Sequence, residues 1–239
     1  MDKKELVGTT NKKNNIMKRK YELTDETMEL YGATLYRIKA SCDFNDVKAG
    51  DLGGWVENED NLSHCDNAWV YNDARIYGNA RVYGDAKIYG DAEIYGNAKI
   101  FGNAEIYNDA EIYGNARVYG DAQVGDNAWV YDNARVYGNA WVFGDAWVYG
   151  NAEVGGDARV NSNRDYIVFK DWWDTGSGRY FTWTRSNDKW KVGDFYGTGD
   201  ELVNRAYQHS ETSGREYARV VEYVNHVKDE LLENKKDSK

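Results

Sequence analysis

Residues 68–160 repeat a unit of six residues almost without variation. Alanine recurs at every sixth position from Ala68 to Ala158, and valine or isoleucine follows two residues after each alanine, from Val70 to Val160. The result is 16 consecutive hexads with no insertion. A period of six fits neither a helical turn of about 3.6 residues nor a propeller blade of about 40 residues. It does fit a parallel β-helix, in which each hexad supplies one short strand and one corner.

If three hexads close one triangular coil, residues 18 positions apart should stack directly on each other. The corner positions agree with this arrangement, because one column of corners is entirely asparagine and the other two contain only aspartate and asparagine. The asparagine column consists of Asn79, Asn97, Asn115, Asn133 and Asn151. Stacked asparagine amides can hydrogen-bond along such a column, and Asn, Asp and Gly tolerate the left-handed backbone of a tight corner.

Each position of the hexad then has a predicted direction. The alanine and the aliphatic residue should face the interior, whereas the residues on either side of the aliphatic one should point outward. The chain contains no proline, as expected if every strand must donate its N–H groups to the next coil. Sixteen hexads correspond to about five regular coils, which form a prism about 25 Å long at roughly 4.8 Å per stacked strand.

The ends of such a prism need caps, because open strand edges would pair with other chains. We expect residues 21–68 to form an N-terminal β cap with a first, irregular coil, since Val56 and Leu62 lie six residues apart but Leu62 and Val70 lie eight apart. Residues 1–20 contain seven Lys or Arg and two acidic residues. They are predicted to be a mobile basic tail.

The composition changes after the regular coils, which are predicted to span residues 69–161. Residues 162–239 begin with alternating apolar and polar residues separated by turn residues, which predicts strands. Apolar residues then recur at helical spacing, at Val220, Val221, Val224, Val227 and Leu231. The predicted fold is mainly β: a parallel β-helix with an N-terminal β cap and a small C-terminal α+β domain made of a three-stranded meander and two helices.

Composition and charge predict where in the cell the protein is found. The chain has a net charge of −10 and a mean hydropathy of −0.82, with no apolar run long enough for a membrane span and no signal peptide pattern. Cys42 and Cys65 lack metal-ligand spacing and are expected to be reduced thiols. We therefore expect a cytoplasmic protein that does not bind a membrane.

The regular coils contain no histidine that could act as a general base or bind zinc. The equal six-residue faces resemble hexapeptide β-helices, which are best known from acyltransferases and one class of carbonic anhydrases, where histidines act as general base or zinc ligands. Here His64, His209 and His226 all lie outside the regular coils, and no insertion closes a substrate pocket. We predict a non-catalytic protein without cofactor or metal, and keep an acyltransferase as the weakest alternative. Residues 66–160 contain no threonine, which excludes an ice-binding plate.

The outward positions carry the candidate binding residues. Trp129 and Trp147 share one predicted face with Tyr131 and Tyr149, and Trp141 lies on another. Stacking between coils explains tyrosine at nearly every hexad, but the fold does not require these tryptophans, which either bind a partner or contact the C-terminal domain. Trp, Tyr and Arg are enriched at interface hot spots. The remaining face carries a basic column, consisting of Arg81, Lys99, Arg117 and Arg135.

Several segments outside and inside the repeat resemble a known group of proteins. "LYRIKA", "DVKAGDLGGWVENEDNLS", "NAWVY" and "YGNARVYGDA" are similar to segments of phage and prophage hexapeptide-repeat proteins, often labelled polymer-forming. The resemblance covers roughly residues 20–160. It implies a left-handed β-helix and a mobile-element setting in a bacterial host, but no activity and no catalytic residues.

Two functions are compatible with these features. The first is a protein-binding module that presents aromatic and charged faces to a protein complex of the host. In a phage setting that complex could be a defence assembly such as a CRISPR effector, whose positively charged channel an acidic protein could fill. The second is a self-assembling structural scaffold. A homodimer or small homo-oligomer is compatible with both, and direct nucleic-acid binding is not expected.

Overall fold

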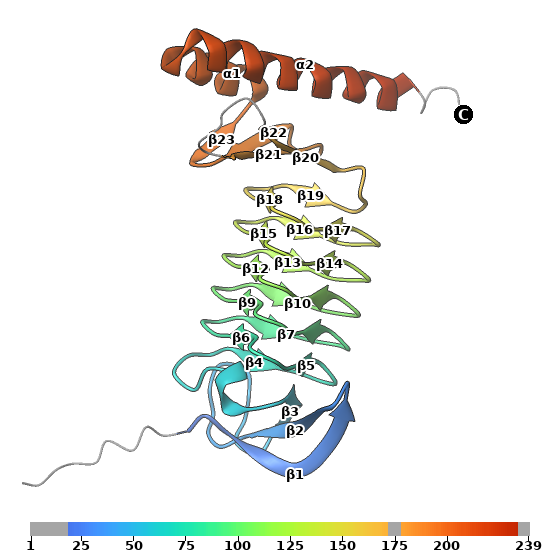
Figure 1. Ribbon diagram of the computed structural model, residues 1–239. Helices are drawn as coiled ribbons and strands as arrows, with labels where there is room; N and C mark the ends of the chain where they lie inside the picture. Colours follow the sequence, from blue (N-terminus) through green and yellow to red (C-terminus); the bar gives the residue numbers. More distant parts are fainter. Residues whose placement is uncertain (1–18, 172–177, 234–239) are drawn as a thin grey trace, which may run out of the picture.

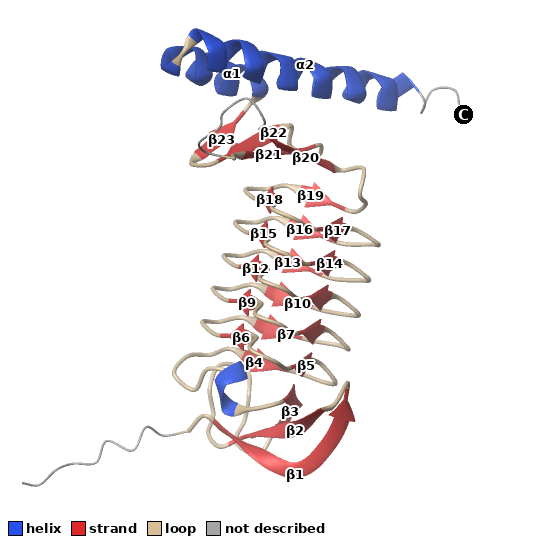
Figure 2. Ribbon diagram, viewed as in Figure 1, coloured by secondary structure: helices blue, strands red, loops and turns tan. Residues whose placement is uncertain are grey.

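Three parts are stacked along one axis of the molecule. The computed structural model describes residues 19–171 and 178–233. A strand-rich cap lies at the N-terminal end, parallel coils form the middle, and a sheet with two helices lies at the C-terminal end (Figure 1). Each coil contains three strands of two residues joined by corners (Figure 2).

The strands of the coils form three flat faces, each named here after its first regular strand. The β5 face comprises β5 (Arg75–Ile76), β8 (Glu93–Ile94), β11 (Glu111–Ile112), β14 (Trp129–Val130) and β17 (Trp147–Val148). The β6 face comprises β6 (Arg81–Val82), β9 (Lys99–Ile100), β12 (Arg117–Val118), β15 (Arg135–Val136) and β18 (Glu153–Val154). The β4 face comprises β4 (Trp69–Val70), β7 (Lys87–Ile88), β10 (Glu105–Ile106), β13 (Gln123–Val124), β16 (Trp141–Val142) and β19 (Arg159–Val160).

The pairing register confirms the predicted coil length. On every face, parallel partners are residues 18 positions apart, as for Glu105 and Gln123 on the β4 face. The left-handed winding stays a prediction of the resemblance.

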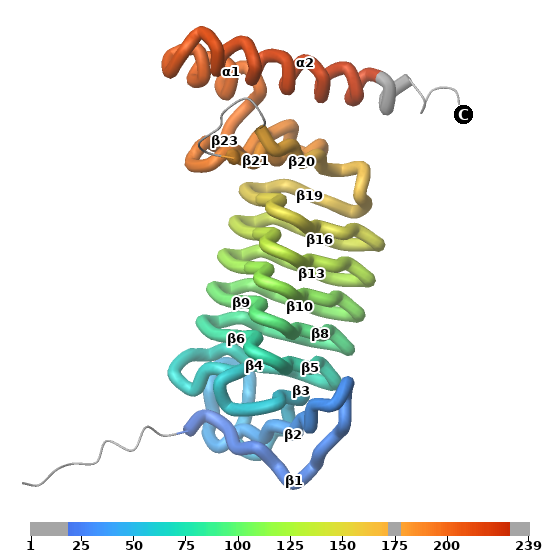
Figure 3. Tube along the Cα trace, viewed as in Figure 1, coloured from blue at the N-terminus to red at the C-terminus, as the bar shows by residue number. Residues whose placement is uncertain are grey.

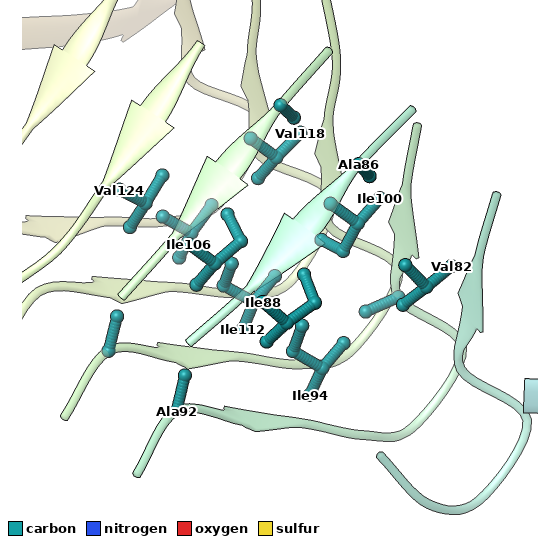
Figure 4. Packing of buried hydrophobic residues seen from close by; sticks show 14 of the residues in the cluster. Val82, Ala86, Ile88, Ala92, Ile94, Ile100, Ile106, Ile112, Val118 and Val124 are labelled. Atoms are coloured by element: carbon teal, nitrogen blue, oxygen red, sulfur yellow. The ribbon is translucent and has the colours of Figure 1, made fainter. Parts of the chain in front are cut away.

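The interior of the coils is a dry column of alanine and aliphatic side chains. Every repeat alanine from Ala68 to Ala158 is 0 % exposed. The aliphatic residues meet across the prism axis, where Ile88, Ile94 and Ile100 lie close to one another (Figure 4). The predicted inward directions are therefore confirmed, and the small alanine beside each corner leaves room for the larger aliphatic residue.

The corners explain the Gly, Asn and Asp residues of the repeat. The position after the aromatic residue has a positive φ, for example +76° at Gly84, and a Cβ there would lie 2.8 Å from the backbone nitrogen of Gly102 in the next coil. Where glycine is missing, Asn108 and Asp132 adopt the same left-handed conformation. One position further on, the predicted amide column forms hydrogen bonds, such as 3.3 Å from Asn79 Nδ2 to Asn97 Oδ1.

Backbone hydrogen bonds join each coil to the next in both directions, as in any parallel ladder. At the outward residues of the hexads the N–H groups donate to the following coil; the N–H of Arg117, for example, donates to the carbonyl of Ala134 at 2.9 Å. In this part of the ladder the last regular coil has N–H groups with no backbone acceptor, and the first has carbonyls with no donor from a regular coil.

The N-terminal cap consists of an antiparallel sheet and an irregular coil. The cap elements are β1 (Tyr21–Leu30), β2 (Ala33–Ala40), β3 (Leu52–Val56) and the short 3-10 helix η1 (Glu59–Asn61). Val56 pairs with Ile76 and Leu62 with Val82, which are steps of 20 residues rather than 18. The cap coil thus holds the two extra residues expected between Leu62 and Val70 and winds less regularly than the coils that follow (Figure 3).

The cap supplies hydrogen-bond donors to all three faces at the N-terminal end of the coils, and one donor on each face illustrates this. Lys20 Nζ donates to Ala68 O at 2.6 Å on the β4 face. The Trp55 N–H donates to Ala74 O at 2.9 Å on the β5 face, and Asn61 Nδ2 donates to Ala80 O at 2.9 Å on the β6 face. Two of these three donors are side chains that replace the backbone of a preceding coil.

The prediction of a mobile basic tail over residues 1–20 was wrong for its last two residues, Arg19 and Lys20. Residues 1–18 lie outside the described residues, but Arg19 forms an ion pair with Glu59, and Lys20 is buried. Lys20 is held because its ammonium group donates to two backbone carbonyls, Asp66 O at 2.9 Å and Ala68 O at 2.6 Å. Charge composition alone does not separate such a lysine from its neighbours in the sequence.

The C-terminal domain contains one more strand than predicted. Its sheet has the order β20 (Tyr166–Lys170), β21 (Tyr180–Thr184), β22 (Lys189–Val192) and β23 (Phe195–Gly197), and all of its pairs are antiparallel. The prediction of three strands was wrong because Gly193, with a φ of +55°, and Asp194 form a tight turn into the three-residue strand β23. The two predicted helices are α1 (Gly199–His209) and α2 (Glu211–Glu233).

The sheet lies between the last coil and the helices (Figure 1). Alternate residues of β21 face opposite sides, so Phe181 and Trp183 pack in one core with α1 and α2. Thr182 points to the coils, where its Oγ1 accepts the N–H of Glu153 at 3.0 Å on the β6 face. Asn163 Oδ1 accepts the N–H of Trp147 at 2.7 Å on the β5 face, and Ser186 Oγ accepts the N–H of Arg159 at 2.6 Å on the β4 face. Each face is thus closed by one side-chain oxygen.

The interior position of alanine can be tested by enlarging one such side chain. Ala116→Leu should lower the free energy of unfolding by about 1–3 kcal/mol or more, because the added atoms have no space in the closed coil. Arg117→Leu, at the outward position next to it, is the matched control and should change stability little. Urea unfolding measures both. Equal stability of the Ala116 variant and the parent would contradict the inward assignment.

The capping oxygens can be tested at Thr182. Thr182→Val keeps the shape and β-propensity of the residue but leaves the buried Glu153 N–H without an acceptor, so thermal unfolding should show a loss of about 1–3 kcal/mol. Thr182→Ser keeps the acceptor and should lose less, although it removes a methyl group. If serine is as damaging as valine, packing rather than the hydrogen bond accounts for the role of Thr182.

Candidate protein-interaction surfaces

Aromatic side chains form continuous stacks along the outside of the coils. On the β5 face, Tyr77, Tyr95 and Tyr113 stack with ring centroids 5.0 and 4.9 Å apart and nearly parallel planes. On the β6 face, Tyr83 and Phe101 do the same at 5.0 Å. Each ring therefore covers a face of its neighbour and presents its edge to solvent. This stacking supports the structural interpretation of the repeated tyrosine.

An exposed aromatic patch ends the stack on the β5 face. It consists of Trp129, Tyr131, Trp147 and Tyr149, which form a two-by-two array. The Trp129 and Trp147 rings stack at 5.2 Å with an interplanar angle of 9°, and the Tyr131 and Tyr149 rings stack at 5.3 Å. Trp147 is 42 % exposed and Tyr149 is 47 % exposed. The patch is thus a flat, pre-ordered apolar surface.

Trp141 does not belong to this patch. It lies on β16 of the β4 face, where the guanidinium of Arg159 is 4.7 Å from its ring centroid. Its ring also contacts Phe143 edge to face at 5.6 Å. The three tryptophans predicted to gather near the C-terminal end are therefore divided between two faces, two on the β5 face and one on the β4 face.

The C-terminal domain leaves the rings of the patch uncovered. Trp147 meets that domain through its backbone, since its N–H donates to Asn163 and its carbonyl accepts the Tyr166 hydroxyl at 2.7 Å. The other contacts come from elsewhere in the last coil, such as the Tyr196 hydroxyl to Gly155 O at 3.1 Å and the ion pair between Lys191 and Glu153. The structure therefore does not favour the prediction that tryptophan rings attach the domain.

Charged residues on the β5 face have partners. Arg75 contacts Glu93 at 2.8 Å, and the Tyr77 hydroxyl donates to the same carboxylate at 3.0 Å. The Tyr95 hydroxyl donates to Glu111 at 3.2 Å. Two carboxylates stacked in register are thus each satisfied within the fold.

The predicted basic column lies in register on the β6 face. The pairs Arg81–Lys99, Lys99–Arg117 and Arg117–Arg135 are all parallel strand partners. Arg135 contacts Glu153 at 3.5 Å. For Arg81, Lys99 and Arg117, the described part of the chain places no carboxylate oxygen within 4.0 Å.

A groove lies at the N-terminal end of the basic column. The irregular cap coil overhangs the β6 face and forms a pocket of about 650 Å³. Its lining includes Arg81 and Lys99 from the coils and Arg19, Glu59 and Asp60 from the cap, where Arg19 and Glu59 form an ion pair. The sequence signal for this groove is the eight-residue step between Leu62 and Val70, which we linked to an irregular coil but not to a concave surface.

The histidines lie where the sequence analysis expected them, outside the regular coils. The His64 ring stacks on Tyr21 at 4.1 Å, its Nδ1 accepts the Lys20 N–H, and burial lowers its pKa. Among the described residues, no three His, Cys, Asp or Glu side chains are grouped closely enough to hold a metal ion. Neither helix of the described chain is long and apolar enough to cross a membrane.

The residues that sequence reasoning missed are those that close the coils. Lys20 and Asn61 at one end, and Asn163, Thr182 and Ser186 at the other, lie outside the hexads and have no repeated neighbours to align them. Asn61 lies within the "NEDNLS" segment, and its burial at 1 % exposure is explained by its two carbonyl partners, Gly78 O and Ala80 O.

The repeats match a known family model. Residues 74–90, 110–126, 128–144 and 134–150 match the YdcK beta solenoid repeat. The matches lie within the coils and include neither the N-terminal cap nor the C-terminal domain. Together with the parallel coils, they show a β-solenoid repeat protein. No curated protein matches the chain.

The stacked tyrosines predict a loss of stability at alkaline pH. Burial and the Glu93 charge raise the pKa of Tyr77 above its ordinary value of 10.0, and burial raises that of Tyr107 to about 12. Such groups stay protonated in the folded state while they ionise in the unfolded state. The free energy of unfolding should therefore fall as the pH rises above 10.0.

Urea unfolding across this pH range measures the effect. Lys20 acts in the opposite direction over a lower window, because burial lowers its pKa from 10.5 to about 8 and stability then rises with pH between these values. The double variant Tyr77→Phe and Tyr95→Phe isolates the tyrosines, since Phe101 already occupies an equivalent stacked position on the β6 face. An unchanged alkaline slope in this variant would contradict the assignment.

Proposed function

We propose that the chain is a non-catalytic protein-binding module and that the aromatic patch of Trp129, Tyr131, Trp147 and Tyr149 is its contact surface. The observation that supports this most directly is the exposure of Trp147 and Tyr149 at 42 % and 47 % beside a domain that attaches without their rings. A large exposed apolar patch with polar surroundings is typical of an interaction site.

The composition of the β5 face supports the same conclusion. The outward position before the aliphatic residue is Arg75, Glu93 and Glu111 in the first coils and tryptophan only in the last two. The fold accepts a charged residue there, so tryptophan is not needed for stacking. Trp and Tyr give large contact areas, and rings already ordered by stacking lose little conformational entropy when a partner binds.

The partner we favour is a protein complex of a bacterial host, with inhibition of a defence assembly as the outcome. This part rests on the resemblance of the cap and hexads to phage and prophage proteins. The net charge of −10 and the acidic corners that flank the β5 face, such as Asp91 and Asp145, would favour approach to a positively charged nucleic-acid channel.

A scaffold that grows end to end fits the structure less well. Stacking requires the carbonyls of one end to meet the N–H groups of the other, yet each face carries its own donor at one end and its own acceptor at the other. Sedimentation velocity distinguishes the two functions, because a scaffold must associate beyond a small closed oligomer.

An affinity pull-down from bacterial lysate, with nuclease treatment, tests the aromatic patch. The double variant Trp129→Glu and Trp147→Glu installs the residue found at positions 93 and 111 of the same face. We expect it to fold and to lose the captured partner. The matched control is Trp141→Glu, which removes a tryptophan of similar exposure from the β4 face and should keep the partner.

Thermal melting and limited proteolysis accompany the pull-down. If the double variant melts early or its C-terminal domain becomes protease-sensitive, the two rings are structural and the proposed surface is wrong. Retention of the partner by a well-folded double variant would contradict the proposal equally.

A further inference from the structure

Three members of the basic column, Arg81, Lys99 and Arg117, are the cations of the coils that the described chain leaves uncompensated. Within the described residues, the other basic residues of the coils each have a partner: Arg75 pairs with Glu93, Lys87 with Asp46 and Arg135 with Glu153. The guanidinium of Arg159 lies over the Trp141 ring. Arg81, Lys99 and Arg117 have no such carboxylate or ring partner in the described chain.

This arrangement has a cost for the fold. Arg81, Lys99 and Arg117 lie on consecutive strands in register, at roughly 4.8 Å per strand, so like charges stand directly opposite one another. Like charges at opposed positions destabilise a sheet. The comparable carboxylates Glu93 and Glu111 on the β5 face are relieved by tyrosine hydroxyls. On the β6 face, Phe101 has no hydroxyl to offer.

The surface around these cations also attracts negative charge. Tyr83, Phe101 and Tyr119 stack beside the column at 5.0 and 4.9 Å, with planes 1° apart. Because their faces cover one another, they present ring edges, which carry partial positive charge. At the N-terminal end the column meets the groove under the cap coil, where Glu59 and Asp60 end the positively charged surface.

We propose that the β6 face binds an acidic, extended segment of a protein partner, with carboxylates over Arg81, Lys99 and Arg117. The straight column of cations fits a linear ligand rather than a compact anion. Arginine offers paired N–H donors that match carboxylate oxygens. This surface lies on a different face from the aromatic patch and does not depend on the function proposed for that patch.

An acidic peptide fits this face better than a nucleic acid. Single-stranded nucleic acids bind through bases stacked on free aromatic faces, whereas the rings here are already stacked on each other. The net charge of −10 would also repel a long polyanion. A short acidic segment needs only the local positive field of the column.

Fluorescence anisotropy with a labelled octaglutamate peptide tests the proposal on the full chain at low salt. The triple variant Arg81→Gln, Lys99→Gln and Arg117→Gln should bind about tenfold more weakly, since three exposed ion pairs are lost. The parent's binding should weaken with added salt. The variant should melt no earlier than the parent, because it removes repulsion from the sheet.

A charge-matched control separates local from overall charge. The variant Lys39→Gln, Lys48→Gln and Arg219→Gln removes three exposed cations from the cap and α2, and should bind the peptide as the parent does. The Trp129→Glu and Trp147→Glu variant should also keep it, so failure of this proposal is distinguishable from failure of the aromatic patch.

Three results would overturn the proposal. The first is equal peptide affinity in the triple variant and the parent. The second is tighter binding of an oligothymidine than of octaglutamate, which would indicate a nucleic-acid surface. The third is self-association of the parent that the triple variant abolishes, which would identify the acidic corners of a second copy as the occupant.

Discussion

The backbone ladder between coils is the constraint on which the rest of this structure depends. Each coil exchanges hydrogen bonds with the coils before and after it, so the backbone is paired everywhere except at the two ends of the stack. Carbonyls of the first coil then need donors, and N–H groups at the outward residues of the last coil need acceptors. Lys20 and Asn61 supply donors, and Asn163, Thr182 and Ser186 supply acceptors, in addition to the backbone of β3. The two terminal regions differ in fold because these two tasks differ in chemistry.

The hexad separates what the fold needs from what the surface displays. Folding uses the alanine, the aliphatic residue and the corner, which are buried or held in a left-handed conformation. The outward position before the aliphatic residue makes no contact that the interior requires. It therefore varies freely along each face, which allows tryptophan at 129 and 147 and unpaired cations at 81, 99 and 117 on the same rigid prism.

Both terminal regions influence these surfaces. The C-terminal sheet contacts the last coil through Thr182, Ser186 and backbone groups, so the rings of Trp147 and Tyr149 stay exposed. The extra two residues of the cap coil accompany a groove at the N-terminal end of the basic column.

The sequence by itself determined the coils, because an uninterrupted period of six fixes strand length, register and direction for every residue within it. It thus predicted that Ala116 faces the interior, which faces carry Trp129 and Arg117, and that Asn79 begins a column of amides.

Only the tertiary structure decided what closes the coils and which surface residues are compensated. Lys20, Thr182 and Ser186 are single residues outside any repeat, and they contact coils 27 to 48 positions away in the chain. The 18-residue spacing already places Glu153 after Arg135, and the structure shows that these two side chains make contact at 3.5 Å. The closing contacts of Lys20, Thr182 and Ser186 depend instead on how the terminal regions fold onto the coils, and no repeat of the chain records them.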